Sequence, residues 1–311
     1  MAKTLPLIQP KKLKKGDCIG VIAPAGVTKE EELTKGLAVL KRMGFKLALG
    51  EHLSKRKRTM AGEDHERAFD LMTMFSNPEI KGIVCARGGY GSNRILPLLT
   101  SRVIRENPKV FVGSSDITAL HIFLNQKCSL VSFHGPMAAG SFGRDAMKKS
   151  KKQFAQMLMG DRKALKLASR QTQTLVPGQA EGELAGGCLS LLIRSLRTPY
   201  EIQTQNKILF IEDVGEPYYK LDAMLCQLKQ AGKFKKIKGV VLGEMIRCKP
   251  SYKGDGPLED IFREAFAEYS IPVLYNAPIG HGDEMWTVPF GVRATLDATK
   301  RTLDIESCGV S

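Results

Sequence analysis

The sequence lacks the long apolar runs of a membrane protein. Nowhere in its 311 residues is there a stretch of about 18 apolar residues, the length needed to cross a bilayer. Its first residues, MAKTLPLIQPKKLKKGD, contain no apolar core followed by a small-residue cleavage site. This start is not typical of a secretory signal peptide. We therefore expect a cytoplasmic protein without a membrane partner.

The signatures of disulfides and metal sites are also missing. The 7 cysteines are an odd number, and no two of them form a C-x-x-C pair. Several lie in apolar stretches, such as Cys85 in IVCA, so we interpret them as reduced core thiols. There is no H-E-x-x-H motif and no cysteine–histidine cluster with zinc spacing. We therefore expect no metal and no cofactor, and a cysteine nucleophile is disfavoured.

Acidic residues are few compared with basic ones. The chain has 47 Lys and Arg against 32 Asp and Glu, a formal net charge of +15. Such a surface attracts anions of any kind. The basic clusters are short and are not interleaved with aromatic residues, and no nucleic-acid-binding motif is present. We expect no nucleic-acid partner, whereas a small substrate with several carboxylates is compatible with the charge.

Apolar runs in the N-terminal half predict a doubly wound parallel α/β sheet. The composition, 43% hydrophobic and 25% charged, is typical of a globular chain, and the length suits two domains of about 150 residues. Helical patterns alternate with short apolar runs at 18–24, 45–49, 80–86, 110–113 and 130–133, as in a parallel sheet with covered faces. Thr28 and Glu31 have the spacing of a capping box at the start of the first helix.

The C-terminal half predicts a mixed α+β domain. Strand-like runs lie at 207–211, 239–242, 272–276, 293–296 and 302–305, and helical patterns lie at 219–230 and 258–269. The segment 169–182 is polar, contains Pro and Gly, and has no periodicity, so we place a domain boundary there. The predicted domains are 1–168 and 169–311.

A candidate nucleophile follows the fourth predicted strand. The sequence VFVGSSDIT at 110–118 runs from an apolar strand into a helix through Gly-Ser-Ser-Asp. A serine at such a turn lies at the carboxyl end of the sheet, where α/β proteins bind ligands. Backbone N–H groups at the helix start can stabilise an oxyanion there. Ser115 is the candidate and Ser114 is its rival; both are also ordinary N-cap residue types.

A glycine loop follows the third predicted strand. Residues 86–91 read ARGGYG, and glycines allow backbone to approach a ligand closely. In a doubly wound sheet this loop lies near the turn that carries Ser115. A backbone N–H of Gly88 or Gly89 could complete an oxyanion hole. A phosphate-binding loop or a plain tight turn remain alternatives, because the dinucleotide fingerprint is incomplete.

A carboxylate and a histidine in the second half could complete a hydrolytic site. Glu212 ends the apolar run ILFIE, and His281 lies between two glycines in PIGHGD. A buried glutamate bound to an imidazole fixes its tautomer and stabilises the imidazolium. The alternatives are a solvated acidic turn and an incidental loop histidine. His134, in FHGP after the fifth predicted strand, is the best competing base.

Together these stretches resemble the LD-carboxypeptidase family, whose members include muramoyltetrapeptide carboxypeptidase and microcin C immunity proteins. The resemblance spans nearly the whole chain and rests on a combination of five stretches: GDCIGVIAPAG at 16, ARGGYGSNRILPLL at 86, VGSSDITALH at 112, LFIEDVGEPYYKLDAMLCQL at 209 and NAPIGHGDEMWTVPFG at 276. It implies an N-terminal α/β domain of the flavodoxin or Rossmann type. It also implies a C-terminal swivelling β/β/α domain, and a homodimer.

The resemblance also implies a role for each candidate residue. Ser115 is the nucleophile, Glu212 the acid and His281 the base. The oxyanion hole is formed by the backbone amides of Asp116 and of the glycine loop, at Gly88 or Gly89. Arg87 and Tyr90 are interpreted as substrate contacts.

The substrate that the resemblance implies is a murein tetrapeptide, which loses its terminal D-alanine in peptidoglycan recycling. One alternative is an immunity-type peptidase that acts on peptidyl or acyl-sulfamoyl nucleotides. Another is a non-enzymatic α/β protein that binds a nucleotide through the glycine loop. The chain departs from the family's frequent G-G-N-L-S at one position, because Cys188 stands in place of Asn; this change could alter specificity.

Overall fold

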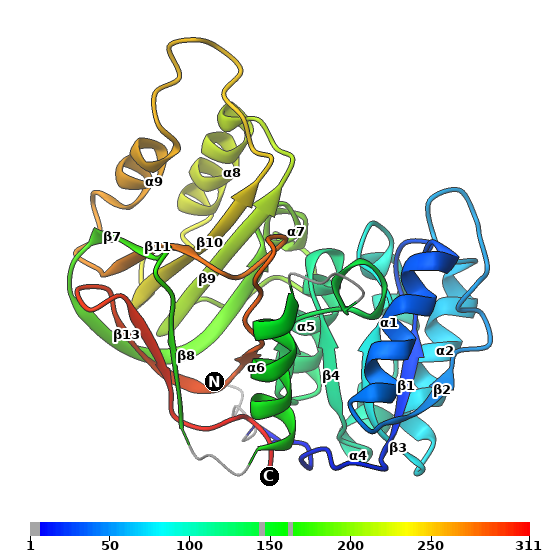
Figure 1. Ribbon diagram of the computed structural model, residues 1–311. Coiled ribbons are helices and arrows are strands. Elements are labelled where there is room, and N and C mark those ends of the chain that lie inside the picture. The colour runs from blue at the N-terminus through cyan, green and yellow to red at the C-terminus, as the bar shows by residue number, and fades with distance from the viewer. Residues whose placement is uncertain (1–6, 143–146, 161–163) are drawn as a thin grey trace. The chain divides into compact units, whose positions relative to one another are not determined.

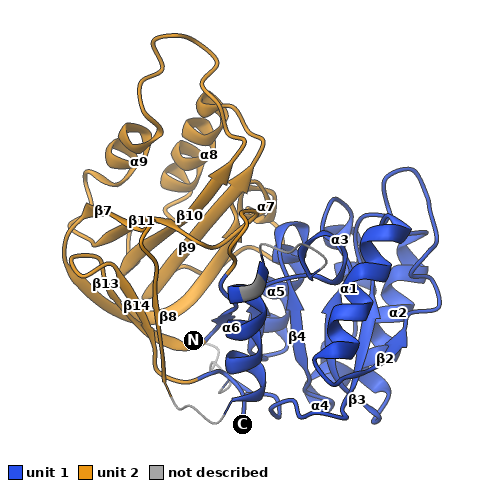
Figure 2. Ribbon diagram, viewed as in Figure 1, with its two compact units in different colours: residues 1–162, 286–291, 308–311 blue, residues 163–285, 292–307 orange. Residues whose placement is uncertain are grey.

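The computed structural model describes residues 7–142, 147–160 and 164–311. The chain divides into two compact units (Figure 2). Unit 1 comprises Met1–Arg162, Trp286–Gly291 and Cys308–Ser311, and unit 2 comprises Lys163–Met285 and Val292–Ser307. In the described ranges, no helix has both the length and the apolar character needed to cross a membrane.

Unit 1 is built on a largely parallel sheet (Figure 1). Its strands are β1 (Cys18–Ile22), β2 (Lys46–Leu49), β3 (Ile80–Cys85), β4 (Val110–Gly113), β5 (Ser132–His134) and β12 (Val288–Phe290). They lie in the order β12-β5-β4-β3-β1-β2, and only the pairing of β12 with β5 is antiparallel. Every residue of β4 and β5 is buried, as expected for strands covered on both faces.

The helices of unit 1 cover both faces of this sheet. They are α1 (Glu30–Arg42), α2 (Asp64–Ser76), α3 (Ser92–Ile95), α4 (Ser101–Glu106), α5 (Thr118–Lys127) and α6 (Lys148–Met159). The chain reverses direction across the sheet after β2, so right-handed crossovers place α1 and α2 on opposite faces. Helix α4 contacts α2, and α5 contacts α3. The reversal creates a switch point between β1 and β3, and ligands bind at the carboxyl ends of strands beside such a point.

Unit 2 contains a mixed eight-stranded sheet. Its strands are β6 (Leu165–Ala168), β7 (Gln173–Val176), β8 (Gln179–Cys188), β9 (Lys207–Val214), β10 (Gly239–Ile246), β11 (Val273–Ala277), β13 (Arg293–Asp297) and β14 (Thr302–Ile305). They lie in the order β6-β14-β13-β8-β9-β10-β11-β7, and the four consecutive strands β8 to β11 are parallel. The carboxyl ends of these four strands therefore meet at one edge.

Three helices follow the first three parallel strands of unit 2. They are α7 (Leu189–Ser195), α8 (Tyr218–Gln230) and α9 (Leu258–Phe266). Helix α8 contacts both α7 and α9, so the three helices lie in one layer on the same face of the sheet (Figure 1). The expected fold class, a parallel α/β sheet followed by a second mixed sheet, is confirmed.

The two edges of the unit 2 sheet come close together. Strands β6 and β7 lie at opposite ends of the strand order, yet only residues 169–172 separate them in the sequence. An extended residue spans about 3.5 Å, so the two edges are less than about 20 Å apart and the sheet must curl. The short crossing segment 169–172 therefore passes near the ends of strands that are distant in the sequence.

Candidate active site

Ser115 lies on a tight turn between β4 and α5. Ser114 is extended, with φ −153°, whereas Ser115 has φ +60°. This left-handed conformation is rare for a residue with a side chain and costs about 1–2 kcal/mol. Ser114 is buried, with 2% of its surface exposed, and Ser115 is partly exposed. The turn therefore presents Ser115, rather than its rival Ser114, toward solvent.

The glycine loop after β3 packs directly against this turn. A Cβ atom on Gly88 would lie 2.8 Å from the Cβ atom of Ser115 and 3.2 Å from the backbone nitrogen of Asp116. The backbone N–H of Gly26 donates to the carbonyl oxygen of Gly88 at 2.8 Å. In a trans peptide the C=O and N–H groups point in opposite directions. The N–H of Gly89 therefore points away from Gly26.

Buried polar groups hold the turn and the loop in place. The Oδ2 atom of Asp116 accepts the backbone N–H of Ser92 at 2.8 Å, and the Ser92 hydroxyl donates to the carbonyl oxygen of Asp116. Arg67, which is 1% exposed, donates from Nη1 to the carbonyl oxygens of Pro24 and Gly91, both at 2.8 Å. These contacts fix the C-terminal end of the glycine loop relative to the loop after β1 and to the turn that carries Ser115.

The two residues interpreted as substrate contacts lie in the same loop. Arg87 is partly buried, and its Nη1 atom donates to the carbonyl oxygen of Val27 at 3.0 Å. Tyr90 is 41% exposed, and its hydroxyl is hydrogen-bonded to Arg94. Both side chains are thus anchored within unit 1.

The other histidines of this unit's core are poor candidates for a base. His121 is buried and uses both ring nitrogens, with Ser132 Oγ and the carbonyl oxygen of Gly113 each at 2.9 Å. Burial lowers the pKa of His121 to about 4, so its ring is neutral. His134 has 0% of its surface exposed and packs against Phe290. Neither ring is open to a substrate.

In unit 2, His281 is hydrogen-bonded to Glu212. The Nδ1 atom of His281 lies 2.8 Å from Glu212 Oε2, and the side chains are 23% and 0% exposed. Glu212 lies in β9 near its carboxyl end, and His281 lies on the loop after β11. The bond occupies Nδ1 and leaves Nε2 as the nitrogen that can take a proton.

The charge around His281 favours its protonated form. Burial opposes the positive charge and by itself lowers the pKa of the ring. The negative charge of Glu212, its hydrogen bond to the ring and the charge of Asp213 outweigh burial. The pKa of His281 is therefore raised above its ordinary value. A histidine of this kind can hold a proton during a reaction.

Two glycines allow the His281 loop to approach Glu212. A Cβ atom on Gly243, in β10, would lie 2.5 Å from the carbonyl oxygen of Ile279 and 2.9 Å from the Cβ atom of Glu212. A Cβ atom on Gly280 would lie 2.8 Å from Glu212 Oε2, and this glycine has φ +122°. Side chains at either position would push the loop away from the carboxylate.

Cys188 ends β8 directly beside Glu212. The two residues are register partners in the sheet, and Cys188 Sγ lies 3.2 Å from Ser190 Oγ and 3.6 Å from Asp213 Oδ1. Burial, reinforced by the charges of Glu212 and Asp213, raises the pKa of the thiol well above its ordinary value. The protonated thiol can donate to Asp213, so it is part of the acidic cluster rather than a nucleophile.

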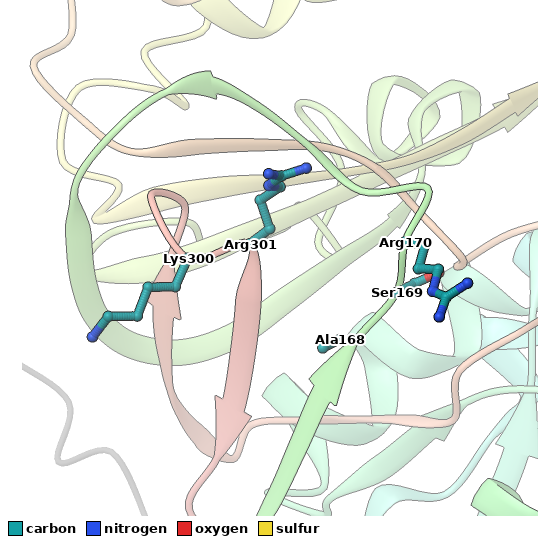
Figure 3. A pocket seen from close by; sticks show the side chains of 5 residues that line it. All are labelled: Ala168, Ser169, Arg170, Lys300 and Arg301. Carbon is teal, nitrogen blue, oxygen red and sulfur yellow. The ribbon is translucent and has the colours of Figure 1, made fainter.

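A separate surface hollow in unit 2 does not involve these residues. It has a volume of about 390 Å³ and is lined by Ala168, Ser169, Arg170, Lys300 and Arg301. Figure 3 shows the charged ends of the three basic side chains spread apart rather than converging on one point. Within the described ranges, no cluster of His, Cys, Asp and Glu could hold a metal ion.

The sequence matches known families along most of its length. Residues 19–135 match the LD-carboxypeptidase N-terminal domain, and residues 181–296 match the LD-carboxypeptidase C-terminal domain. The chain belongs to the LD-carboxypeptidase family. The resemblance inferred from the five stretches is therefore confirmed.

Relatives and solved structures in this family span almost the whole chain. A probable murein peptide carboxypeptidase of Bacillus subtilis is 39% identical over 97% of this chain and 95% of its own. The crystal structure of muramoyltetrapeptide carboxypeptidase from Oxalobacter formigenes is 31% identical, with a TM-score of 0.83, over 93% of this chain and 98% of its own. An apo structure of an inactive mutant of the microcin C7 self-immunity protein MccF is 25% identical, with a TM-score of 0.92, over 97% and 99%.

Some residues that support the candidate site are not apparent from the sequence. Arg67 lies in the charged stretch EDHERAFD, where nothing marks it as buried. Gly243 and Glu244 give a weak signal, because VVLGE repeats the pattern of an apolar run that ends in a carboxylate, as ILFIE does at Glu212. That repetition could have pointed to a second carboxylate at the same edge of the sheet.

Proposed function

We propose that this protein is a serine L,D-carboxypeptidase that releases the terminal D-alanine from murein tetrapeptides in peptidoglycan recycling. The observation that carries the proposal is the 2.8 Å hydrogen bond between His281 Nδ1 and the fully buried Glu212. In serine hydrolases the base is a histidine, and a buried carboxylate that is hydrogen-bonded to its Nδ1 atom orients the ring. His281 and Glu212 have this arrangement. The names of the Bacillus subtilis and Oxalobacter formigenes proteins support the substrate class.

The proposed mechanism begins with proton transfer from Ser115 to His281 Nε2. The Ser115 oxygen attacks the carbonyl carbon of the scissile bond, which links the L-centre of the diamino acid to D-alanine. Glu212 stabilises the imidazolium that forms. The oxyanion is bound by the backbone N–H groups of Asp116 and Gly89, each worth roughly 3 kcal/mol in comparable sites. The geometry of the glycine loop favours Gly89 over Gly88 as the donor.

The second half of the reaction returns the proton. Protonated His281 gives its proton to the nitrogen of D-alanine as the scissile C–N bond breaks, and the carbonyl carbon stays bound to Ser115 as an acyl-enzyme. A water molecule, deprotonated by His281, then attacks the acyl-enzyme. The ester C–O bond breaks, Ser115 takes the proton back from His281, and the tripeptide is released. Arg87 would contact a substrate carboxylate, Tyr90 would line the same loop, and the net charge of +15 would help to attract the anionic peptide.

The proposal is tested by incubation with murein tetrapeptide and mass spectrometry of the products. The wild type should remove one alanine, and Ser115→Ala should lose nearly all of this activity while keeping the wild-type circular dichroism spectrum. Ser114→Ala is the matched control, because it also removes a serine hydroxyl, but from the buried residue that precedes Ser115. Full activity of Ser115→Ala would refute the mechanism.

The microcin C immunity activity is the second candidate. The TM-score of 0.92 to the MccF structure favours it, although the more similar Bacillus subtilis relative is a probable murein peptide carboxypeptidase. Comparing turnover of murein tetrapeptide with turnover of a peptidyl-nucleotide analogue separates the two. We expect the tetrapeptide to be hydrolysed at least tenfold faster, expressed as kcat/KM, a difference of about 1.4 kcal/mol.

We further propose that the protein works in the cytoplasm as a homodimer, as the sequence and the family resemblance predict. Cell fractionation tests the location, and light scattering of the purified protein tests the oligomeric state. A periplasmic or secreted pool, or a mass of 34.2 kDa, would contradict these two proposals.

A further inference from the structure

A second carboxylate, Glu244, lies beside the loop that carries His281. Glu244 is in β10, which lies between β9, with Glu212, and β11, which leads to His281. Its backbone N–H donates to the carbonyl oxygen of Ile279 at 3.1 Å. Glu244 thus contacts the start of the loop through its backbone, and its partly buried side chain is free to reach further along it.

The Glu244 side chain reaches the residue after His281. A Cβ atom on Gly282 would lie 2.0 Å from Glu244 Oε2, so the carboxylate lies directly on the backbone of Gly282. The carboxylate and the Gly282 backbone are therefore in contact, and the nearby N–H of Gly282 lowers the pKa of Glu244. The loop is therefore held on both sides of its histidine, at Ile279 and at Gly282, by one residue of β10.

The carboxylate is itself held by the crossing segment between β6 and β7. Gln171 Nε2 donates to Glu244 Oε1 at 3.1 Å and approaches the carbonyl oxygen of Asn276 at 3.4 Å. The side chain of Asn276, at the end of β11, donates back to the carbonyl oxygen of Gln171 at 3.2 Å. These bonds connect Glu244 to the strand from which the His281 loop departs.

The contacts of Glu244 restrict the conformational freedom of the His281 loop. His281 lies between Gly280 and Gly282, and glycines give a backbone more conformational freedom than other residues. The hydrogen bond from His281 to Glu212 is a single contact at the ring. A reacting group displaced by about 1 Å can lose on the order of 100-fold in rate. A second contact on the backbone of the same loop would limit such displacement.

We propose that Glu244 is a positioning residue that holds the Gly282 backbone and thereby keeps the His281 ring against Glu212. The proposal rests on the proposed function of His281 as the base. Glu244 acts through the loop and does not itself touch the substrate. Its role is orientation, so its loss should lower kcat and leave KM nearly unchanged.

The test compares Glu244→Ala with Glu244→Gln in the full-length protein. Glu244→Ala removes the hydrogen bond from Gln171 and the contact with the Gly282 backbone, and should lower kcat by about 10- to 100-fold. Glu244→Gln keeps a planar group of the same size against the Gly282 backbone, and its one amide oxygen can accept the Gln171 N–H, so it should restore most of kcat. Asp283→Asn is the control for charge, because Asp283 is also acidic and raises the pKa of Glu244 by repulsion, after burial and together with Glu284. It should keep the wild-type kcat.

A second readout does not depend on activity. The Nδ1 proton that His281 shares with Glu212 should give a sharp downfield NMR signal in the wild type. The signal should broaden or disappear in Glu244→Ala and return in Glu244→Gln. Gln171→Ala, which removes the donor to Glu244 and leaves the carboxylate in place, should give an intermediate effect, and it carries the test if Glu244→Ala fails to fold.

The outcomes separate this proposal from the one on which it rests. Wild-type kcat and a sharp signal in Glu244→Ala would overturn the positioning role. An equal loss of kcat in Asp283→Asn would also overturn it, because the effect would then be one of charge. Activity in His281→Ala would instead overturn the proposed function. An inactive His281→Ala together with a fully active Glu244→Ala would refute only the positioning role.

Discussion

The two units hold their candidate functional groups in place by different means. In unit 1 the functional groups are set by backbone geometry: Ser115 has a left-handed conformation, and Gly88 packs against it. In unit 2 they are set by charge, because the buried Glu212 holds His281 through one hydrogen bond. In unit 1, Ser115 has a positive φ angle, a conformation in which glycine is usual. In unit 2, the residue with a positive φ angle next to His281 is Gly280. Activity should therefore depend on the shape of the residues around Ser115 in unit 1 and on the charge of the residues around His281 in unit 2.

Glu212→Gln should have the largest effect, because it removes charge and preserves size. The amide oxygen can still accept the Nδ1 proton, but it cannot stabilise an imidazolium. We expect kcat to fall on the order of 10³- to 10⁴-fold, as when a triad carboxylate is made neutral in other hydrolases. The pKa of His281, measured by NMR titration, should fall as well.

Asp213→Asn should also lower the pKa of His281, but by less than Glu212→Gln does. Asp213 raises the pKa of His281 less than Glu212 does, so its neutralisation should lower that pKa by a smaller amount. A Glu212→Gln variant that keeps more than a tenth of the wild-type kcat would show that charge does not dominate the unit 2 part.

Gly88→Ala should have the next largest effect, through shape alone. The new Cβ atom would lie 2.8 Å from the Cβ atom of Ser115, so the glycine loop must shift away from the turn. Loss of one oxyanion donor lowers kcat by about 10²- to 10³-fold. The NMR titration of His281 should be unchanged.

A glycine in open space provides the control for Gly88→Ala. A Cβ atom on Gly254 would meet nothing within 4 Å, so Gly254→Ala should have wild-type kinetics. If Gly88→Ala changed the pKa of His281, the separation between a shape-dependent part and a charge-dependent part would be wrong.

The pH dependence of kcat/KM reports on the unit 2 part by itself. A base must be unprotonated to take a proton, so activity should fall as the pH drops through the pKa of His281. That pKa is raised above the ordinary value of 6.5, so the acid limb should have its midpoint above 6.5. Below it, kcat/KM should fall about tenfold per pH unit. An acid limb centred below 6.5 would contradict the effect of Glu212.

The acid limb of the pH profile, measured in two variants, separates the effect of charge in unit 2 from the effect of shape in unit 1. Glu212→Gln should move its midpoint to lower pH, because the group that stabilises the proton is lost. Gly88→Ala should lower kcat/KM at every pH without moving the midpoint.

The local features of the fold were predictable from the sequence. The apolar runs at 18–24 and 80–86 became β1 and β3, because short buried strands are marked by their own residues and by the turns around them. Ser115 and Glu212 became candidates for the same reason, since Ser115 lies at the turn after such a run and Glu212 ends one. The candidate residues of the site thus have local signals.

Helix starts were less predictable. The expected capping box of Thr28 and Glu31 is wrong, because α1 begins at Glu30 with Lys29 at the N-cap and no side-chain cap. Its first turn instead carries three glutamates. Their negative charges interact favourably with the positive end of the helix dipole and stabilise the helix start. At the start of α2 the Glu66 carboxylate accepts the Glu63 N–H at 2.8 Å. The spacing is that of a capping box, but Glu63 is not a usual cap residue.

Features that depend on distant pairing could not be predicted. Strand β12, at Val288–Phe290, contains Pro289 and pairs with β5; proline is tolerated there because β12 is an edge strand. Strand β7 lies within the polar segment 169–182 and pairs with β11. The contacts of Gln171 with Glu244 and Asn276 depend on the same crossing. The site's supporting contacts are set by the sheet order rather than by local residues.

The smallest effect that we predict is the change in stability caused by Ser115→Gly. Glycine adopts φ +60° without steric strain, which relieves about 1–2 kcal/mol, but it also makes the unfolded chain more flexible, at about 0.4–1 kcal/mol. We expect the variant to be inactive and more stable by roughly 0.5–1 kcal/mol in urea unfolding. Gly280→Ala in unit 2 should be less stable than the wild type, because its Cβ atom would lie 2.8 Å from Glu212 Oε2. Opposite signs for the two substitutions would show that strain is located at the nucleophile and is avoided at the base, whereas a destabilised Ser115→Gly would mean that the turn stores none.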